Sequence, residues 1–433
     1  MDEAVVALVM LVVFAWGLFS TRLGRADLSA PIIFVTVGLL LSQVVHVVEP
    51  ELSREAVKLL AEVTLVWVLF ADASRVGIRE FRADLGLYTR LLAVGLPLTI
   101  AAGTLLAMWM FDGMGVWLAL LVGAALAPTD AALGSGVMAD PAVPERIRRV
   151  LNVESGLNDG IATPVVMFAI AGAVAAGVID GGPGGGLSGL AIGLAVGVAL
   201  GAVGGRAMRL AGRRGWMSED FAGPGVLALA LAAYAATLWL DGNGFVAAFV
   251  AGLAFGNSAG RGGVKEVFYV EQTAGLVSLL TWLTFGAIAV PIVMAEIDWR
   301  MAGYAVLSLT VLRMLPVCLV LLGARLSPAT MAFVGWFGPR GLASIIFALI
   351  ALEELHGEAD RVVAIIGTTV LFSVFAHGLS AKPLANRYAA TATDVVPVPP
   401  GDGSAQLPIR GLLHRPAAGP ARPAGEPGEP RAG

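Results

Sequence analysis

Three carboxylates and two guanidinium groups lie deep inside long apolar stretches of this 433-residue sequence. One such stretch, LNVESGLNDGIATPVV at residues 151–166, holds two of the acids together with an asparagine. Ionisable side chains are rare in apolar stretches long enough to span a membrane, and those that occur usually serve a function. The residues concerned are Asp130, Glu154, Asn158, Asp159, Arg313 and Arg340.

Their positions put these charges at a similar depth. At 1.5 Å per helical residue, Asp159 lies about 15 Å beyond the basic cluster that precedes its stretch. That depth is near the centre of an apolar layer about 30 Å thick. Asp130, Arg313 and Arg340 are each central in their own stretches, and Glu154 lies about 1.5 turns nearer one end.

Charge balance at this depth leaves one carboxylate over. If both arginines pair with acids, the third acid must bind a proton or a cation, because a bare charge in an apolar layer is too costly. A carboxylate that alternates between these two states exchanges protons against cations. Glu154 is expected to be the structural acid, with Arg313 as its partner and Arg340 as the second choice. A purely structural set of ion pairs is the alternative interpretation.

Asp159 is the acid to which we assign the exchange. Ser155 and Thr163, four residues before and after it, bring hydroxyl oxygens to the same helical face. Asn158 adds an amide oxygen without charge. Hard cations prefer oxygen ligands of these kinds.

Two stretches are predicted to break at the same depth. In ALAPTDAALG, residues 125–134, Pro128 disfavours helix at the preceding residue, and Thr129 and Asp130 suit the N-cap of a helix that resumes there. The segment Gly338-Pro339-Arg340-Gly341 interrupts the stretch 328–353 in the same way.

Broken helices inside a membrane are tolerated only beside a protein-lined cavity. Two of them, oppositely directed and at matching positions, indicate inverted repeats around a central site. Opposed half-helices bring positive N-termini and negative C-termini together. We expect Asp130 to face the former and Arg340 the latter.

Composition indicates which elements must hold these residues. The chain is 57% hydrophobic and only 14% charged, with 55 glycines, whereas soluble domains carry about 25% charged residues. Abundant glycine suits close packing between membrane helices. The predicted fold class is therefore an all-α polytopic membrane protein. The single cysteine, Cys318, excludes an internal disulfide.

Thirteen membrane spans are predicted, with the N-terminus outside and the C-terminus in the cytoplasm. This orientation puts eighteen Lys and Arg residues in cytoplasmic segments and four outside, as the positive-inside rule requires. Residues 391–433 are rich in Pro and Gly and lack aromatic residues, which is typical of a disordered tail. The spans lie at about 4–19, 28–48, 56–74, 87–111, 115–139, 147–178, 187–211, 221–240, 243–258, 270–295, 301–323, 328–353 and 361–385.

Weaker candidates lie elsewhere. Asp72 is near the inner end of the third span and is a candidate gate for the cytoplasmic mouth. His377 lies inside the last span, as a packing residue or as a pH sensor. The glycine-rich stretches lack the lysine of a phosphate-binding loop, so neither a nucleotide cofactor nor a nucleic-acid partner is expected.

The motifs APTD, ESGLNDG and GPRG, in this order and spacing over about residues 1–390, resemble those of the monovalent cation–proton antiporter-1 family. This family contains bacterial sodium/proton antiporters and is related to animal sodium/proton exchangers. The resemblance implies that Asp159 carries the ion and the proton, supported by Asn158, Ser155 and Thr129. It also implies that Asp130 belongs to the helix crossing, that Glu154 is a buried salt-bridge acid, and that Asp72 is a further cation ligand.

The resemblance further implies a homodimer in the plasma membrane, electroneutral exchange from the Asn-Asp pair, and two units in each protomer. The scaffold would comprise about 1–85 and 187–295, and the mobile core about 87–178 and 301–385. The ion ligands would be Asp159, Ser155 and Thr129, with no bound cofactor and no enzymatic activity. Na⁺ is the first expectation for the cation.

Two other functions are alternatives to antiport for this sequence. A cation channel with a regulatory tail would pass currents that are insensitive to a pH gradient. An intramembrane aspartyl protease also needs two aspartates in mid-membrane, but the GxGD stretch of such enzymes is absent from this sequence.

Overall fold

The computed structural model describes residues 3–25, 28–44, 54–77, 82, 84–131, 133–138, 143–177, 184–260, 263–355 and 359–391. Within these ranges every regular element is a helix. The tail predicted for residues 391–433 lies outside the described residues from residue 392 onward.

The helices follow one another along the chain in an order that matches the predicted spans. Each predicted range coincides with one helix or with consecutive helices. The elements are α1 (Glu3–Arg25), α2 (Ala30–Gln43), α3 (Arg54–Ser74), α5 (Leu85–Tyr88), η1 (Thr89–Gly95), α6 (Leu96–Met110), α7 (Val116–Ala125), α8 (Ser135–Met138), α9 (Glu145–Gly177), α10 (Gly184–Arg213), α11 (Glu219–Trp239), α12 (Gly244–Ala259), α13 (Gly263–Thr284), η3 (Phe285–Ala289), α14 (Val290–Glu296), α15 (Trp299–Leu309), α16 (Val311–Leu321), α17 (Pro328–Trp336), α18 (Leu342–Leu355) and α19 (Asp360–Thr391).

Eight helical spans of the described chain are long and apolar enough to cross a membrane, and α2, α7 and α12 are shorter apolar helices. Many large apolar side chains face outward, among them Leu11, Phe14, Leu105 and Trp109, each more than 60% exposed. In water such a surface would be unfavourable, whereas in lipid it is solvated. The all-α, multi-span membrane fold predicted from composition is confirmed.

Two prolines explain the two π-helical segments, η1 and η3. Each segment ends directly before a helix that carries proline in its first two positions, Pro97 in α6 and Pro291 in α14. Proline has no N–H and its ring clashes with the carbonyl four residues earlier. The wider π turn gives that carbonyl room, so the chain continues through the proline as one span.

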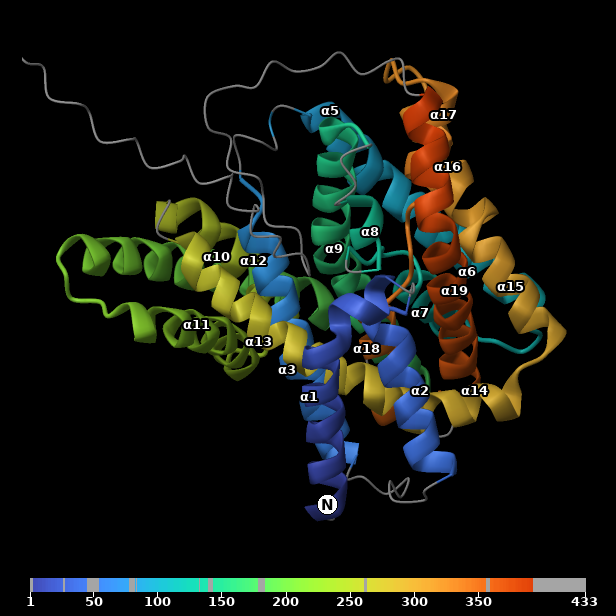
Figure 1. Cartoon of the computed structure of the whole chain (residues 1–433), viewed down its shortest axis with the longest axis horizontal. Helices are drawn as coiled ribbons and strands as arrows, with labels where there is room; N and C mark the ends of the chain where they lie inside the picture. Colours follow the sequence, from blue (N-terminus) through green and yellow to red (C-terminus); the bar gives the residue numbers. More distant parts are fainter. Residues whose placement is uncertain are drawn as a thin grey trace, which may run out of the picture.

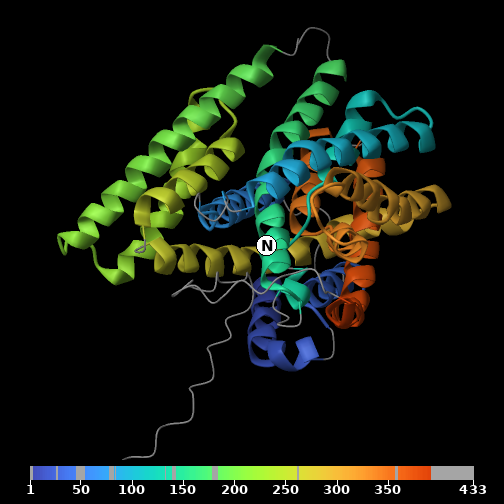
Figure 2. The ribbon, with the colours of Figure 1, turned by 90° about the horizontal axis from the view of Figure 1, so that it is seen from above.

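The helices form two lateral groups with shared helices between them. Figures 1 and 2 show α10 and α11 at one side of the molecule and α15 and α16 at the opposite side. Helices α3 and α9 lie between these groups, and both pack against α12 and α18.

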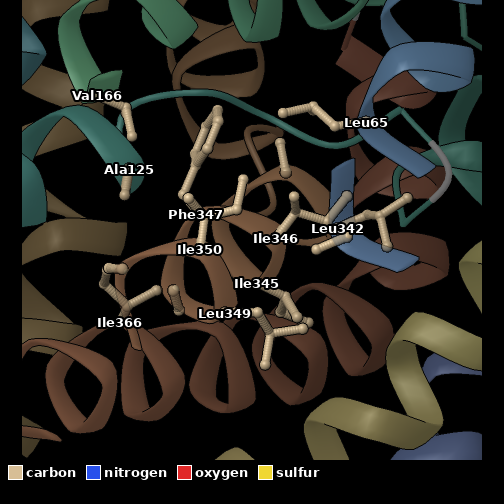
Figure 3. Packing of buried hydrophobic residues seen from close by; sticks show 14 of the residues in the cluster. Leu65, Ala125, Val166, Leu342, Ile345, Ile346, Phe347, Leu349, Ile350 and Ile366 are labelled. Atoms are coloured by element: carbon tan, nitrogen blue, oxygen red, sulfur yellow. The ribbon is translucent and has the colours of Figure 1, made fainter. Parts of the chain in front are cut away.

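The buried centre is built around α18. All residues from Leu342 to Ala351 are buried, and a helix that is apolar on every side belongs in a protein interior. Figure 3 shows its side chains surrounded by Leu65 of α3, Ala125 of α7, Val166 of α9 and Ile366 of α19. The N-terminus of α18 is therefore fixed in position at the middle of the molecule.

Helices of the α10 group approach one another closely through glycine. A side chain at Gly201 of α10 would collide with the backbone of Ala251 in α12, and one at Gly252 of α12 with the backbone of Phe70 in α3. Backbone-to-backbone packing of this kind is typical of membrane helices. It joins α3, α10 and α12 into one tightly packed unit.

Candidate functional site

The two predicted breaks meet at one point. Helix α7 ends at Ala125 and α8 begins at Ser135, while α17 ends at Trp336 and α18 begins at Leu342. The non-helical segments between them touch, because the amide of Asp130 donates to the carbonyl of Pro339 at 2.7 Å. The prediction that helix resumes at Thr129 or Asp130 is wrong, because α8 starts five residues after Asp130. The bond to Pro339 holds this segment in a non-helical conformation as far as the start of α8.

Asp130 caps the opposite half-helix instead of its own. Its Oδ2 accepts a hydrogen bond from the amide of Leu342, the first residue of α18, at 2.8 Å. Its Oδ1 accepts a longer bond from the amide of Leu133, at 3.4 Å. A buried carboxylate at a helix N-terminus satisfies a free N–H and faces the positive end of the dipole.

Arg340 binds the carbonyl groups at the C-terminal end of α7, as Asp130 binds an amide at the N-terminus of α18. Its Nη1 donates to the carbonyls of Ala127 at 2.8 Å and Pro128 at 3.1 Å, just beyond the end of that helix. Ser344 of α18 donates to the carbonyl of Ala125 at 2.7 Å. Arg340 is completely buried, so these carbonyls provide hydrogen bonds that stabilise a charge with no access to water.

Glycine gives the crossing its close approach. An added Cβ at Gly341 would overlap the carboxyl group of Asp130. At Gly338 it would lie 2.9 Å from the Cγ2 of Thr129 and 2.5 Å from the Nε of Arg313. Both glycines of the GPRG segment therefore lie where a neighbour leaves no room for a side chain. The neighbours are Asp130 at Gly341, and Thr129 and Arg313 at Gly338.

Asp159 lies on α9 beside a cluster of oxygen atoms at this crossing. The hydroxyls of Thr129 and Ser155 are 2.8 Å apart, and the Nδ2 of Asn158 donates to Thr129 Oγ1 at 2.7 Å. Asp159 is 7% exposed and the other three are 1–3% exposed. The buried Oδ1 of Asn158 makes no hydrogen bond among the described residues. Asp159 follows Asn158 directly and lies four residues after Ser155 on α9, so the helix brings it to the same part of the fold as these neutral oxygen atoms.

Thr163 is buried on the same helix, but its hydroxyl has a local partner. It donates to the carbonyl of Asp159 at 2.6 Å, the usual bond of a helical threonine to the preceding turn. The structure brings Thr129 and Ser155 into the cluster, and Thr163 supports the backbone behind it.

Glu154 and Arg313 form the buried ion pair. Arg313 Nη2 lies 2.6 Å from Glu154 Oε1, and both side chains are 3% exposed. Of the two partners considered for Glu154, the structure selects Arg313, while Arg340 is bonded to the α7 carbonyls. The charge of Glu154 is therefore neutralised about 1.5 turns of α9 away from Asp159.

A small cavity lies between α3 and α9 on the side of Asp72, with space of about 20 Å³ for a water-sized group. Its position next to Gly156 puts Asp72 one turn of α9 from Asp159. We call this cavity the Asp72 pocket. Its lining consists of Asp72, Arg75, Val76, Ala131, Asn152, Val153 and Gly156.

The comparison with known families decides the identity of this fold. The profile described as "Sodium/hydrogen exchanger, transmembrane" matches residues 7–387, which include both breaks and the whole of α9. The chain belongs to the sodium/hydrogen exchanger family.

Similar proteins support this family assignment. The K(+)/H(+) antiporter NhaP of Alkalimonas amylolytica is 26% identical, over 88% of this chain and 66% of its own length. The Na(+)/H(+) antiporter NhaP of Pseudomonas aeruginosa is 27% identical, over 76% of this chain and 81% of its own length. The chain spans two thirds or less of the length of the K(+)/H(+) relatives that it matches.

The fold also has a solved counterpart. The structure of a sodium proton antiporter from Methanocaldococcus jannaschii, MjNhaP1, superposes with a TM-score of 0.74. The alignment covers 89% of this chain and 98% of that one, at 17% identity.

Sequence reasoning missed Ser373 at the helix crossing, and it singled out His377 without the contacts that the structure gives it. Ser373 of α19 accepts a hydrogen bond from the amide of Arg340 at 2.6 Å. His377, one turn further, lies 3.0 Å from the carbonyl of Trp336 through Nε2 and 3.2 Å from Ser373 Oγ through Nδ1. The four-residue spacing of Ser373 and His377 was the available signal. Their partners lie more than 30 residues away and leave no local pattern.

The Glu154–Arg313 pair gives a stability prediction. We expect Glu154→Gln and Arg313→Ala each to lower the free energy of unfolding by about 3–5 kcal/mol, because each leaves a buried charge without its partner. The double variant should lose less than the sum of the two. Denaturation of the purified protein in detergent measures all three.

The exposed pair Lys58–Glu354 is the matched control for this cycle. Its atoms are 2.5 Å apart, but the side chains are 37% and 38% exposed. Removing either partner should change stability by about 0–1 kcal/mol. Strictly additive losses at Glu154 and Arg313 would contradict the assigned pairing.

Proposed function

We propose that this protein is a secondary antiporter that exchanges a monovalent cation for H⁺ across the cell membrane, with Asp159 as the group that binds each in turn. The observation that carries the proposal is the cluster of Asp159, Asn158, Ser155 and Thr129 at the crossing of two broken helices. The family assignment agrees with it, since similar proteins are named as K(+)/H(+) and Na(+)/H(+) antiporters.

The chemistry follows from the charges at the crossing. Asp130 is engaged by the N-terminus of α18, and Glu154 by Arg313. Asp159 lies on the same helix as Ser155 and Asn158 of the oxygen cluster, and we assign to it the alternate binding of a proton and a cation. The hydroxyl, amide and carboxyl oxygens around it are ligands for a hard cation such as Na⁺ or K⁺. Binding is mutually exclusive, because a protonated carboxyl group is a poor cation ligand.

The mechanism we propose is alternating access by movement of a core against a scaffold. The core would comprise α5–α9 and α15–α19, and the scaffold α1–α3 and α10–α14. Close glycine contacts with backbone occur inside each unit, for example between Gly123 and the carbonyl of Ile100 within the core. Across the units, Gly160 meets the ring of Phe249 and Gly367 meets the side chain of Val293. Side chains can change rotamer as packed elements slide, which favours movement at this boundary.

Na⁺ is the first candidate for the cation, and K⁺ is the competitor. Similar proteins are named as antiporters of each of these two cations. The measurement that separates them is the collapse of an imposed pH gradient in vesicles containing the purified protein. Addition of Na⁺, K⁺ or Li⁺ to separate samples ranks the three cations by apparent affinity and rate.

Exchange is expected to be electroneutral, with one proton for each monovalent cation. A single carboxylate that alternates between H⁺ and a cation carries no net charge through the cycle. The rate should also have a bell-shaped pH profile, because low pH keeps Asp159 protonated and high pH deprives the return step of protons.

The electroneutrality test uses liposomes in which valinomycin and K⁺ gradients clamp the membrane potential, with Na⁺ as the transported cation. We expect the exchange rate to be independent of the imposed potential. A rate that rises with potential, and that loses this dependence in Asp72→Asn, would show a second titrating group in the cycle. A channel would instead give a cation current without proton movement.

We further propose that the protein forms a homodimer in the plasma membrane, with the N-terminus outside. These proposals rest on the resemblance to the antiporter family and on the distribution of basic residues. Crosslinking in native membranes tests the dimer, and labelling of single cysteines on each side tests the orientation.

A further inference from the structure

The break between α17 and α18 interrupts one particular helix hydrogen bond. In a continuous α-helix the amide of Arg340 would donate to the carbonyl of Trp336, four residues earlier. Here α17 ends at Trp336 and α18 begins at Leu342, so this bond is not made. A buried backbone group without a partner is costly. The amide of Arg340 and the carbonyl of Trp336 therefore each need a partner from elsewhere.

Helix α19 supplies both partners from a single turn. Ser373 Oγ accepts a hydrogen bond from the amide of Arg340 at 2.6 Å. His377, four residues later on the same helical face, has its Nε2 3.0 Å from the carbonyl oxygen of Trp336. That carbonyl also accepts the amide of Gly338 at 2.7 Å, which its second lone pair allows. The two groups that a helix would join directly are thus both bound to α19.

The partners of His377 determine which ring nitrogen carries the hydrogen. A carbonyl oxygen only accepts, so Nε2 carries a hydrogen and donates it to Trp336. Nδ1 lies 3.2 Å from Ser373 Oγ and 3.0 Å from the carbonyl oxygen of Ser373. In the neutral ring Nδ1 is an acceptor, and of these two oxygens only the hydroxyl can donate to it. Ser373 therefore accepts from Arg340 and donates to His377.

The charges around His377 agree with a neutral ring. The side chain is 2% exposed. Among the described residues, the charged groups that act on it are the guanidinium groups of Arg340, in the break, and Arg313, on α16. A second proton, on Nδ1, would add a third positive charge to this buried region. It would also deprive the Ser373 hydroxyl of its acceptor.

We propose that Ser373 and His377 are positioning residues that replace the interrupted helix bond of the second break. A chain of hydrogen bonds runs from the amide of Arg340 through the Ser373 hydroxyl and the His377 ring to the carbonyl of Trp336. This chain fixes the end of α17 relative to Arg340, whose side chain binds the carbonyls beyond α7. The inference rests on the proposed function, because this break is part of the proposed cation site.

Ser373→Ala is the first variant of the test, because it removes the acceptor of the Arg340 amide and adds no bulk. Hydrogen–deuterium exchange of the purified protein, resolved to single residues by fragmentation mass spectrometry, reads this amide directly. We expect it to exchange about fivefold faster, the effect of losing one hydrogen bond. The amide of Leu342, which binds Asp130, should keep its protection. Unchanged protection at Arg340 overturns the inference.

Transport is the second readout. Cation-dependent proton flux in proteoliposomes should fall about fivefold or more in Ser373→Ala, because a binding site tolerates only small displacements. A wild-type rate in this variant would show that the chain of hydrogen bonds does not position the site.

His377→Leu is the decisive variant, because His377 acts on the Arg340 amide only through Ser373. Without Nδ1, the Ser373 hydroxyl turns to a carbonyl of the preceding turn and becomes a weaker acceptor. We expect the Arg340 amide to exchange about twofold faster or more. Unchanged protection overturns the inference. If His377→Leu does not fold, His377→Gln replaces it with the same expectation, since glutamine reaches the level of Nε2 and has no acceptor at the position of Nδ1.

The double variant Ser373→Ala/His377→Leu distinguishes a chain of hydrogen bonds from independent packing. If the two residues act as one unit, its transport rate equals that of the slower single variant. If the two losses multiply, each residue acts separately and the inference is overturned.

The matched control is Ser278→Ala in α13. Ser278 is also buried, but its hydroxyl donates to the carbonyl of Ala274 in its own helix, at 2.6 Å. This variant should keep both the transport rate and the protection of the Arg340 amide.

These measurements separate two failures. If the wild-type protein shows no cation-dependent proton flux, the proposed function fails, and hydrogen exchange still decides whether His377 acts on the Arg340 amide. If the wild-type protein exchanges cations and His377→Leu leaves that amide protected, only the positioning role fails.

Discussion

Asp159→Asn is expected to abolish exchange completely while leaving the protein folded. Asparagine has the same shape and retains one oxygen, so packing in the cluster with Thr129 and Ser155 is preserved. It cannot take up a proton at physiological pH and carries no charge to bind a cation. The measurement is cation-induced collapse of a pH gradient in proteoliposomes, with the Tm in detergent as the test of folding.

A matched aspartate outside the site gives the control. Asp298 is the exposed N-cap of α15 and accepts a hydrogen bond from the amide of Met301 at 2.7 Å. Asparagine is an equally good N-cap, so Asp298→Asn should transport at the wild-type rate. Wild-type exchange by Asp159→Asn would remove Asp159 from the proposed mechanism.

Gly341→Ala is expected to have the second-largest effect, although it adds a single methyl group. The new Cβ would occupy the position of the Asp130 carboxyl group, which must then leave the amide of Leu342. We expect a stability loss of about 1–3 kcal/mol from overpacking. Transport should fall about tenfold or more, because a binding site tolerates only small displacements.

Gly275→Ala is the control for this change. It lies inside α13, and an added Cβ meets no atom within 4 Å. Alanine is a better helix former than glycine, so this variant should be as stable as the wild type or more stable, with unchanged transport. Wild-type activity in Gly341→Ala would show that the contact between Asp130 and Leu342 is dispensable.

The sequence was sufficient to predict the two breaks that form the site. Pro128 and Pro339 each disfavour helix at the residue before them, and the cost of burying an unpaired charge restricts how Glu154 can be neutralised. Both arguments use only local sequence and the apolar surroundings, so they can be made without knowing how the helices pack.

The contacts made by distant residues could not be predicted. Nothing near Ser373 indicates that it binds the amide of Arg340, and nothing near Glu271 indicates that it pairs with Arg75. The resumption of helix after the first break was misplaced for the same reason. Thr129 and Asp130 have the composition of an N-cap, but the tertiary bond from Asp130 to Pro339 overrides that local preference.

Each break supplies the side chain that caps the helix end of the other break, so the two segments depend on each other. Asp130 belongs to the first break and completes α18, while Arg340 belongs to the second and completes α7. Loss of either residue exposes a helix end that the other segment cannot repair by itself. A change at one break is therefore expected to need a matching change at the other, although Asp130 and Arg340 lie 210 residues apart in the chain.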